Sequence, residues 1–369
     1  MNKGVKLRLK IQNILLDIFK SEKKIDAVYI NHKINKFDTR DISFINNVCM
    51  NTMRYIFHTK QILNLYRKKK SNIHEEILLC TAITQIVYLD FKDYAVIDST
   101  IEVAKKFKIY HGFVNAILKK ISKDKFDLVK IEINFEVLPS WFKKKASYLS
   151  NLNKKNIIKT IVQEPDIHIV FKKQEYLYSF EEQIKKSTEV SGFLKEKVNL
   201  KKIKSYNEGK WWVQDFSSFF PLYNFDTNLL NKSNLDLCAA PGGKSFQVLS
   251  KNKNIILNDK NNERIKILIS NLKRLKFKAK ILNFDAINLK NIGQYDFIIL
   301  DAPCSAVGTI RKNPEIFFRT KQPNFDKLIK TQKFLLDTAS KLLKKNGIIL
   351  YMVCSFLKSE TDEQIYKFL

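Results

Sequence analysis

Hydrophobic residues recur at every third or fourth position through about the first 125 residues, and this spacing predicts helices. One such helix face is formed by Ile11, Ile14, Leu15, Ile18 and Phe19. Two more are formed by Val96, Thr100, Ile101, Ala104 and Phe107 and by Phe113, Val114, Ile117, Leu118 and Ile121. The stretch 77–89 is apolar almost all round, as is typical of a helix at the centre of a bundle. With one glycine and no proline between residues 5 and 125, this part is predicted to be an all-α bundle.

The pattern changes twice further along the chain. Between about residues 130 and 220, helical pieces mix with short strand-like runs such as 167–171 and 211–213, which predicts a small α+β unit. From Leu235 onward, short apolar runs alternate with helical stripes. The runs are 235–237, 255–257, 281–282, 297–300 and 348–353, with stripes at 265–275 and 325–343. This alternation predicts a parallel sheet with right-handed crossovers.

The chain is therefore predicted to be multidomain. We place a helical domain at residues 1–128, an α+β connector at 129–220 and an α/β domain at 221–369. In an α/β domain of this kind, ligands bind beyond the carboxyl ends of the strands. The residues that follow each predicted strand are thus the first candidates for a functional site.

Composition and charge narrow the class of protein. The 45% of hydrophobic and 28% of charged residues argue against disordered and fibrous proteins. No apolar run is long enough to span a membrane and no signal peptide is recognisable, so we expect a cytoplasmic protein. The net charge of +29 favours nucleic acid as a partner. A lysine-rich, arginine-poor composition also arises from AT-rich coding, so charge alone leaves both interpretations open.

The run 236–245 (DLCAAPGGKS) follows the first predicted strand, and its two glycines let a ligand approach the backbone. Its end is similar to a P-loop, which has the pattern GxxxxGK followed by Ser or Thr. That pattern requires glycine where this chain has Cys238, so a P-loop NTPase is disfavoured.

Three acidic residues end the next strands: Asp259, Asp285 and Asp301. A single aspartate in such a place is most often a helix cap. Three at successive strand ends favour a binding site instead. Asp259 is placed to accept hydrogen bonds from ribose hydroxyls, and Asp285 lies close to where an adenine edge would sit.

The five cysteines form no CxxC pair, which argues against a disulfide framework and a zinc site, so we expect free thiols. Cys49 and Cys80 fall on helix faces and are interpreted as core residues. Cys238, Cys304 and Cys354 follow predicted strands, where a thiolate in a basic, partly open site can act as a nucleophile. The five histidines share no ligand spacing, so no metal is predicted.

Three motifs carry a specific resemblance. LDLCAAPGGKS, LDAPCSAVGTIRKNPE and YMVCSFLKSETDEQI resemble motifs I, IV and VI of RNA cytosine-C5 methyltransferases, in the order and spacing of the RsmB (Fmu/Sun) branch. VQDFSS at 213–218 resembles the element that precedes motif I in that family. The stretches FDTRDISFINNVCMNTMRY and VIDSTIEVAKKF are similar to the NusB-like domain of RsmB proteins. The resemblance implies a NusB-like RNA-binding domain at 1–128 and a Rossmann-like methyltransferase domain at 221–369.

The resemblance also implies an activity, namely S-adenosylmethionine-dependent methylation of cytosine C5 in RNA, with 16S ribosomal RNA as the substrate of RsmB-type proteins. Cys354 corresponds to the nucleophile that attacks C6, Cys304 to the residue that assists loss of the C5 proton, and Asp301 to the residue that hydrogen-bonds the cytosine ring. The positions that match the family's cofactor contacts are Cys238, Ala239, Ala240, Pro241, Gly242, Gly243, Lys244, Asp259, Asp285 and Asp301. No metal is implied, and we expect a monomer.

Two departures from the family pattern and one alternative stay open. Motif VI reads VCS instead of the commoner TCS, and the chain ends at Leu369, where relatives continue into an antiparallel hairpin. We therefore expect the hairpin to be missing: either the chain is cut short, or the edge of the sheet near the fifth predicted strand is left uncovered. The alternative function is a non-catalytic RNA-binding or ribosome-assembly factor. The cysteines in motifs IV and VI favour the enzyme, because binding alone requires neither thiol.

Overall fold

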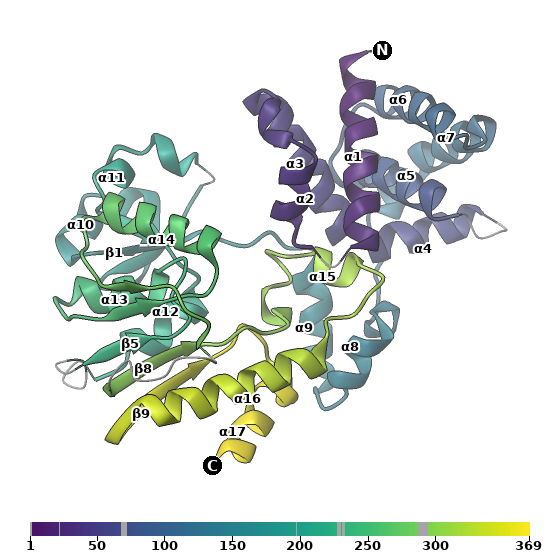
Figure 1. Ribbon diagram of the computed structural model, residues 1–369. Helices are drawn as coiled ribbons and strands as arrows, with labels where there is room; N and C mark the ends of the chain where they lie inside the picture. The colour runs from purple at the N-terminus through teal and green to yellow at the C-terminus, as the bar shows by residue number, and fades with distance from the viewer. Residues whose placement is uncertain are drawn as a thin grey trace. The chain divides into compact units, whose positions relative to one another are not determined.

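The computed structural model describes residues 2–21, 23–67, 72–196, 198–226, 230, 233–286 and 294–369, which form two compact units (Figure 1). The first contains Met1–Glu164 and Thr309–Pro323, and the second contains Pro165–Gly308 and Asn324–Leu369. The predicted connector 129–220 is thus divided between them. The division into three domains at 1–128, 129–220 and 221–369 stays a prediction. No helix in the described ranges is long and apolar enough to cross a membrane.

The first unit is helical, as predicted. Its longer helices are α1 (Lys3–Lys20), α3 (Thr39–Arg54), α4 (Ile56–Tyr66), α5 (Ile73–Ile83), α6 (Asp93–Lys106) and α7 (His111–Leu128). Shorter ones are α2 (Ile25–Asn31), α8 (Ser140–Lys145) and α9 (Asn151–Ile161). On the predicted face of α1, Ile11, Ile14, Leu15 and Ile18 are fully buried, and Phe19 packs against the same core. Side chains cap helices here as well, for example Asp38, which accepts a hydrogen bond from the backbone of Asp41 at the start of α3.

The apolar stretch 77–89 lies in the core of the helical unit, but it is not one regular helix. After α5 the chain continues as a π-helix, η2 (Thr84–Tyr88). Thr84, Gln85, Ile86 and Val87 of this turn are all buried. The buried hydroxyl of Thr84 donates to the carbonyl of Cys80, and the side-chain amide of Gln85 donates to that of Thr81, so these two donors are satisfied by the last turn of α5.

A short segment from the C-terminal half of the sequence completes the helical unit. Its helix α15 (Glu315–Phe318) places Phe318 in the core, with its ring 5.7 Å from the ring of Phe19. Nearby, Arg54 donates to the carbonyl of Arg311 at 3.0 Å. Nothing in the hydrophobic pattern of the sequence indicated this packing, because the contacts join residues about 250 to 300 positions apart.

The second unit contains two sheets. The smaller is antiparallel, with strand order β2-β3-β1-β4, and it belongs to the predicted α+β region. Its strands are β1 (His168–Phe171), β2 (Ile184–Thr188), β3 (Ser191–Leu194) and β4 (Trp211–Val213), with short helices α10 (Gln174–Tyr178) and α11 (Lys204–Asn207) between them. The runs 167–171 and 211–213 were predicted as strands, and β1 and β4 confirm them. The sequence indicated neither β3 nor β2, in which Lys185 and Lys186 are exposed.

The larger sheet is parallel, as predicted, with strand order β7-β6-β5-β8-β9. Its strands are β5 (Asn234–Asp236), β6 (Ile256–Asn258), β7 (Ile281–Leu282), β8 (Tyr295–Asp301) and β9 (Leu343–Met352). The order runs outward from β5 in one direction and from β8 in the other, so the two central strands flank a topological switch point. Ligands of such sheets bind at that point, beyond the carboxyl ends of the strands.

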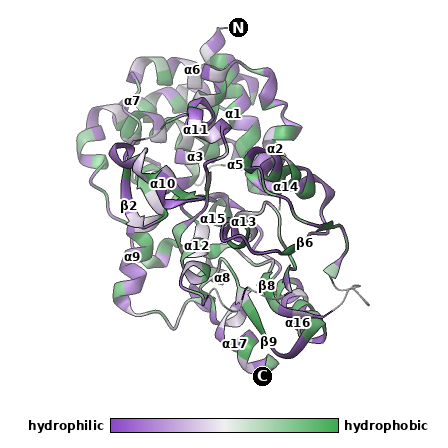
Figure 2. Ribbon diagram, turned by 90° about the vertical axis from the view of Figure 1, so that its left-hand side faces the viewer, coloured by the Kyte–Doolittle hydropathy of each residue, from purple (hydrophilic) through white to green (hydrophobic). Residues whose placement is uncertain are grey.

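Helices cover both faces of the parallel sheet. They are α12 (Phe216–Tyr223), α13 (Gly243–Ser250), α14 (Asn262–Leu275), α16 (Phe325–Leu342) and α17 (Asp362–Phe368). Alternate residues of β8 point to opposite sides: Phe297 and Ile299 pack in the core beneath α12, α13 and α14, while Ile298 and Leu300 pack with α16. Helices such as α16 carry both hydrophobic and hydrophilic residues, as amphipathic helices do (Figure 2).

Strand β9 is the last in the order of the parallel sheet, and it pairs with β8 at Leu343 and, after an irregularity, from Ile348 to Met352. Its residues are partly buried or exposed, whereas most of β8 is fully buried. In the described residues after β9, the chain forms a short turn, η9 (Lys358–Glu360), and then α17.

Candidate active site

Three loops at the carboxyl ends of β5, β8 and β9 bring most of the predicted site residues together. The loop after β8 carries Cys304 and the loop after β9 carries Cys354, and their sulfur atoms lie 3.0 Å apart. Lys244, from the first turn of α13 after β5, reaches Asp301 at the end of β8, with Nζ to Oδ2 at 2.6 Å. Because β5, β8 and β9 are neighbours in the sheet, residues more than a hundred positions apart meet at one edge.

The two thiols polarise each other. A hydrogen bond from the Cys304 thiol lowers the pKa of Cys354, and the same interaction, together with burial, raises the pKa of Cys304. Burial and the carboxylate of Asp301 oppose the shift at Cys354, while the ammonium group of Lys244 supports it. The arrangement therefore places the negative charge on Cys354 and keeps the proton on Cys304. The Cys354 residue is exposed and Cys304 is half-buried, so the charged sulfur is the more accessible one.

Cys238, the third cysteine predicted at this edge, behaves differently. Burial, reinforced by the nearby carboxylates of Asp236 and Asp259, raises the pKa of Cys238 to about 12. Its thiol therefore stays protonated at neutral pH. Of the three cysteines that follow strands, Cys354 alone has a lowered pKa. Cys49 and Cys80 are fully buried in the helical core, as predicted, and all five thiols are free.

The loop between β5 and α13 is held by hydrogen bonds to its backbone. The amide of Ala239 donates to the carbonyl of Asn258 at 2.8 Å, and the amide of Ala240 donates to Oδ2 of Asp259 at 3.2 Å. Arg264 donates to the carbonyl of Ala240 and forms an ion pair with Asp259. The loop is thus attached to β6 and α14, and its backbone is presented to the switch point in one conformation.

The acidic residues at the strand ends differ in their accessibility. Asp259 is 3% exposed, and its oxygens already accept from the amides of Ala240 and Asn261. Asp285 is partly exposed and lies 3.6 Å from Lys260, and Asp301 is partly exposed beside Lys244. Asp259 therefore positions the loop, and a direct contact between Asp259 and a cofactor stays a prediction.

The residues at this edge fit an S-adenosylmethionine molecule. The carboxylates of Asp285 and Asp301 are acceptors for hydroxyl and ammonium groups, and the loop of Cys238 to Lys244 offers backbone groups where a side chain at Gly242 would collide with Phe246. These residues would hold the amino-acid and adenosine parts of the cofactor beside the two sulfurs. No cluster of histidine, cysteine or acidic side chains in the described ranges has the geometry of a metal site.

Gly242 allows a direct test of this loop. Its φ is +113°, and an added Cβ would lie 2.1 Å from the ring of Phe246. We expect Gly242→Ala to weaken the binding of S-adenosylhomocysteine at least about tenfold, measured by calorimetric titration, because the loop must move to relieve strain of about 1–3 kcal/mol. Gly243→Ala is the matched comparison: its Cβ would meet the Gln214 side chain at 3.3 Å and its φ is unstrained, so its loss should be smaller. An equal loss for both variants would contradict the prediction.

Several residues that support the site were not identified from the sequence. Gln214, from the VQDFSS element, donates to the side chain of Gln247 on α13 at 2.9 Å and accepts from the indole of Trp212. His168, to which the sequence assigned no role, bonds the carbonyl of Gln214 at 2.7 Å. Asp236 is buried under the loop and accepts from the hydroxyl of Ser245 at 2.6 Å. The motif strings contain some of these residues, but the contacts of Gln214 with Gln247 and with His168 join residues 33 and 46 positions apart.

Asp236 should make stability depend on pH. Burial raises the pKa of Asp236 to about 7 in the folded protein, whereas an unfolded aspartate titrates near 4. The unfolded chain thus releases this proton first, so stability falls as the pH rises from about 4 to 7, by on the order of 4 kcal/mol. We expect Asp236→Asn to remove this fall, measured as the urea midpoint between pH 4.5 and 8.

Asp296→Asn is the control, because the pKa of Asp296 is lowered in the folded protein whereas that of Asp236 is raised. A hydrogen bond from Lys344, followed by one from the backbone of Ser233, lowers the pKa of Asp296 to about 2. Its contribution is present above pH 4 and is lost as the pH falls toward 2, so Asp296→Asn should lower the midpoint at neutral pH. If Asp236→Asn instead steepened the loss of stability above pH 5, Asp236 would be ionised in the folded protein.

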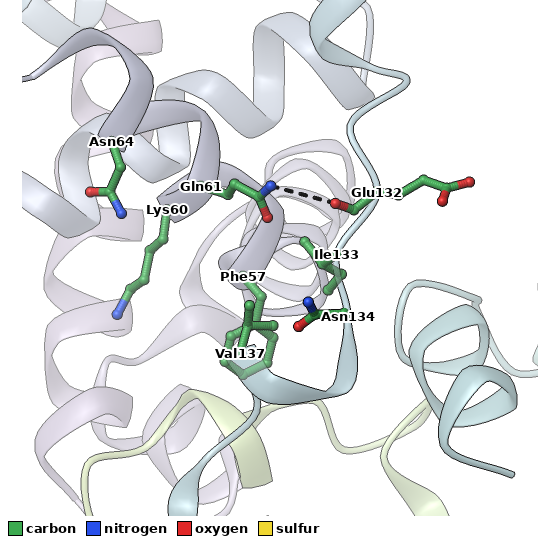
Figure 3. A pocket seen from close by; sticks show the side chains of 8 residues that line it. All are labelled: Phe57, Lys60, Gln61, Asn64, Glu132, Ile133, Asn134 and Val137. Carbon is green, nitrogen blue, oxygen red and sulfur yellow. Dashed lines mark hydrogen bonds between the residues drawn. The ribbon is translucent and has the colours of Figure 1, made fainter. Parts of the chain in front are cut away.

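A shallow cavity of about 550 Å³ lies in the helical unit, apart from the predicted residues. It is lined by Phe57, Lys60, Gln61, Asn64, Glu132, Ile133, Asn134 and Val137 (Figure 3). The ammonium group of Lys60 is paired with Glu76 at 2.9 Å, and the amide of Gln61 donates to the carbonyl of Glu132. Its polar side chains are bonded to neighbouring residues, so we assign it no role.

Comparisons with known proteins agree with this fold. Residues 228–369 match the family described as 16S rRNA methyltransferase RsmB/F, and residues 7–123 match the NusB family. The ribosomal RNA small subunit methyltransferase B of Pasteurella multocida is 27% identical over 96% of this chain and 85% of its own length. The protein of the same name from Shewanella oneidensis is also 27% identical, over 98% of this chain and 89% of its own length.

Solved structures with a similar fold cover both units. The crystal structure of PH0851 matches with a TM-score of 0.71, covering 100% of this chain and 89% of its own, at 20% identity. NSun6 from Pyrococcus horikoshii matches with a TM-score of 0.54, covering 62% of this chain and 86% of its own, at 16% identity. The solved structures show the fold. The family matches show that the chain carries a methyltransferase domain of the RsmB/F family at residues 228–369, behind a NusB-family domain at residues 7–123.

Proposed function

We propose that this S-adenosylmethionine-dependent RNA methyltransferase modifies C5 of a cytosine in small-subunit (16S) ribosomal RNA, through a covalent bond between Cys354 and C6 of the base. The observation that carries the proposal is the pair of sulfurs 3.0 Å apart at the ends of β8 and β9. The names of the relatives from Pasteurella multocida and Shewanella oneidensis support the choice of RNA.

The chemistry of cytosine explains the need for a nucleophile. C5 is too poor a nucleophile to take a methyl group unaided. When the Cys354 thiolate adds to C6, the electron pair of the C5–C6 double bond becomes available at C5, as in an enamine. S-adenosylmethionine, when bound, supplies the methyl group. The addition thus divides one difficult step into easier ones.

The second thiol completes the reaction. After the transfer, the proton on C5 must leave so that the C6–S bond can break and the aromatic ring can re-form. Addition turns the Cys354 thiolate into a thioether, which removes the charge that raises the pKa of Cys304. Cys304 can then lose its own proton to solvent and accept the C5 proton as a base. Both sulfurs must therefore reach one pyrimidine.

Asp301 positions the cytosine, and Lys244 favours the charged form of Cys354. Asp301 lies at the end of β8, three residues before Cys304, and its carboxylate is 2.6 Å from the ammonium group of Lys244. We expect Asp301 to hydrogen-bond the cytosine ring around N3 and so to stabilise the adduct. Lys244 restrains Asp301 and favours the charged form of Cys354. The same groups border the loop that would hold the methyl donor.

The substrate must reach these groups from a folded RNA. A base inside a duplex cannot contact Cys354, so the target cytosine must be unpaired or flipped out of its stack. The net charge of +29 would attract the phosphate backbone. We expect the protein to work as a monomer in the cytoplasm, with its helical domain contributing to RNA binding.

The test is to map the modified base. Purified protein is incubated with 16S ribosomal RNA and S-adenosylmethionine, and the RNA is analysed by bisulfite sequencing and by mass spectrometry of its fragments. We expect one cytosine to become protected from conversion and to gain one methyl group. A reaction with S-adenosylhomocysteine in place of the donor is the control. RNA that is bound without any protected cytosine would instead identify a non-catalytic RNA-binding protein.

A further inference from the structure

Glu360 is a fully buried acidic residue beside the two catalytic loops, and the mechanism above does not use it. It ends the short turn η9, six residues after Cys354. Carboxylates are rarely buried unless their oxygens are fully engaged. The partners of this side chain therefore indicate why a charged group is kept here.

The Glu360 carboxylate joins the loop of Cys304 to the loop of Cys354. Its Oε1 accepts from the backbone amide of Ser305 at 2.8 Å, and its Oε2 accepts from the hydroxyl of the same serine. Oε2 also accepts from the hydroxyl of Ser355 at 2.6 Å. Ser305 directly follows Cys304 and Ser355 directly follows Cys354. One side chain thus binds the residue next to each sulfur.

Glu360 is itself held in place from the other side. The amide of Gln332, on α16, donates to Oε1 at 3.1 Å and also to the carbonyl of Pro303 at 3.0 Å. The hydroxyl of Tyr351 donates to the backbone carbonyl of Glu360 at 3.0 Å. The side chain therefore cannot turn away from the serines without leaving several buried donors unpaired.

We propose that Glu360 is a positioning residue that locks the Cys304 loop to the Cys354 loop, so that the two sulfurs stay within hydrogen-bonding distance. The proposal deepens the function proposed above and rests on it for the catalytic consequence. The loops also share a backbone hydrogen bond, from the amide of Gly308 to the carbonyl of Cys354 at 3.0 Å. Loss of the Glu360 bridge should therefore loosen the sulfur pair while the strands stay paired.

The reactivity of Cys354 is the property that reports on this bridge. Three groups act on the Cys354 sulfur: the thiol of Cys304, the carboxylate of Asp301 and the ammonium group of Lys244. Glu360 acts electrostatically on the Cys304 thiol. Of these, the Cys304 hydrogen bond is the main cause of the lowered pKa of Cys354. When Ser305 and Ser355 are no longer tied together, Cys304 moves away, and the pKa of Cys354 should rise toward that of a free thiol.

The experiment measures the rate at which iodoacetamide alkylates Cys354 from pH 6 to 10, by mass spectrometry of its peptide, in the full-length chain. We expect Glu360→Ala to shift the profile to higher pH. Glu360→Gln should restore most of the wild-type profile, because an amide still accepts from the Ser305 backbone and the serine hydroxyls can turn to accept from its NH₂ group. Ser355→Ala, which removes the link on the Cys354 side alone, should shift the profile in the same direction as Glu360→Ala.

Tyr351→Phe is the matched control, because it removes a hydrogen bond to the backbone carbonyl of Glu360 and leaves the carboxylate bonded to Ser305 and Ser355. It should leave the alkylation profile unchanged. Titration with S-adenosylhomocysteine shows whether each variant keeps its methyltransferase fold. If Glu360→Ala does not keep that fold, the alkylation profile of Ser355→Ala tests the bridge. The proposal is overturned if Ser355→Ala alkylates as the wild type does, or if Glu360→Gln is shifted as far as Glu360→Ala.

Steady-state kinetics separate this proposal from the one on which it rests. We expect Glu360→Ala to lower kcat by roughly a hundredfold, as for a reacting group displaced by about 1 Å, with little change in KM for RNA. A shifted alkylation profile in a protein that methylates no cytosine would support the bridge and contradict the proposed function. An unshifted profile in an active cytosine methyltransferase would contradict the bridge alone.

Discussion

Replacement of Cys354 by alanine should abolish methyl transfer to RNA, with a loss of at least about 10⁴-fold in kcat. The reason is that no other thiol at this edge of the sheet has a lowered pKa: Cys304 holds the shared proton, and burial keeps Cys238 protonated. The measurement is the transfer of labelled methyl groups from S-adenosylmethionine to 16S ribosomal RNA. Binding of S-adenosylhomocysteine should persist, because the cofactor loop does not depend on this side chain.

Cys80→Ala is the control for the loss of a thiol as such. Cys80 is fully buried in the helical unit, and its removal should leave the rate of methyl transfer unchanged. Activity in Cys354→Ala within tenfold of the wild type would show that the sulfur of Cys354 is not the nucleophile. The covalent route would then have no support in this chain.

Replacement of Cys304 by alanine should have a different and equally large effect: the protein stays covalently attached to RNA. Without the second thiol, the C5 proton leaves slowly, so the bond between Cys354 and C6 persists after the methyl group has been transferred. A general base contributes about 10²- to 10⁴-fold, so release should slow by at least about 10²-fold. The adduct is measured as a nuclease-sensitive band of reduced mobility in a denaturing gel.

The double variant Cys304→Ala, Cys354→Ala is the control and should form no adduct. The opposite pattern, in which Cys354→Ala accumulates the adduct and Cys304→Ala releases RNA normally, would reverse the two roles. It would mean that the sulfur at the end of β8 attacks the base, as in DNA cytosine methyltransferases. The hydrogen bond between the thiols would then run from Cys354 to Cys304, opposite to the direction that the lowered pKa of Cys354 indicates.

Much of the architecture could be predicted from local pattern. The helical face of α1 and the runs that became β5 to β9 are recognisable because a buried helix repeats every three to four residues and a buried strand is continuously apolar. Strand β2 was not predicted, because Lys185 and Lys186 are exposed and interrupt its apolar pattern. The packing of α15 in the helical unit could not be foreseen, because it joins segments about 300 residues apart and no periodicity records such a contact.

The residues of the candidate site could likewise be predicted only in part. Motif spacing indicated Cys304, Cys354, Asp301 and the loop around Gly242, and the structure places all of them at the carboxyl ends of neighbouring strands. The motif spacing did not indicate a role for Glu360, although that residue lies inside motif VI. A buried carboxylate in a helical turn looks like any surface glutamate until its partners Ser305 and Gln332 are known.

The order of motifs, the strand ends and the excess of basic residues are properties of the linear chain, and these alone determined the family, the type of sheet and the kind of partner to expect. Tertiary structure decided which sulfur has the lowered pKa, which aspartate is buried against the cofactor loop and which residue joins the two cysteine loops. The physical reason is distance. Hydrogen bonding and electrostatic interactions act over a few ångströms, and Cys304 and Cys354, which lie 50 residues apart, interact only after β8 and β9 have paired.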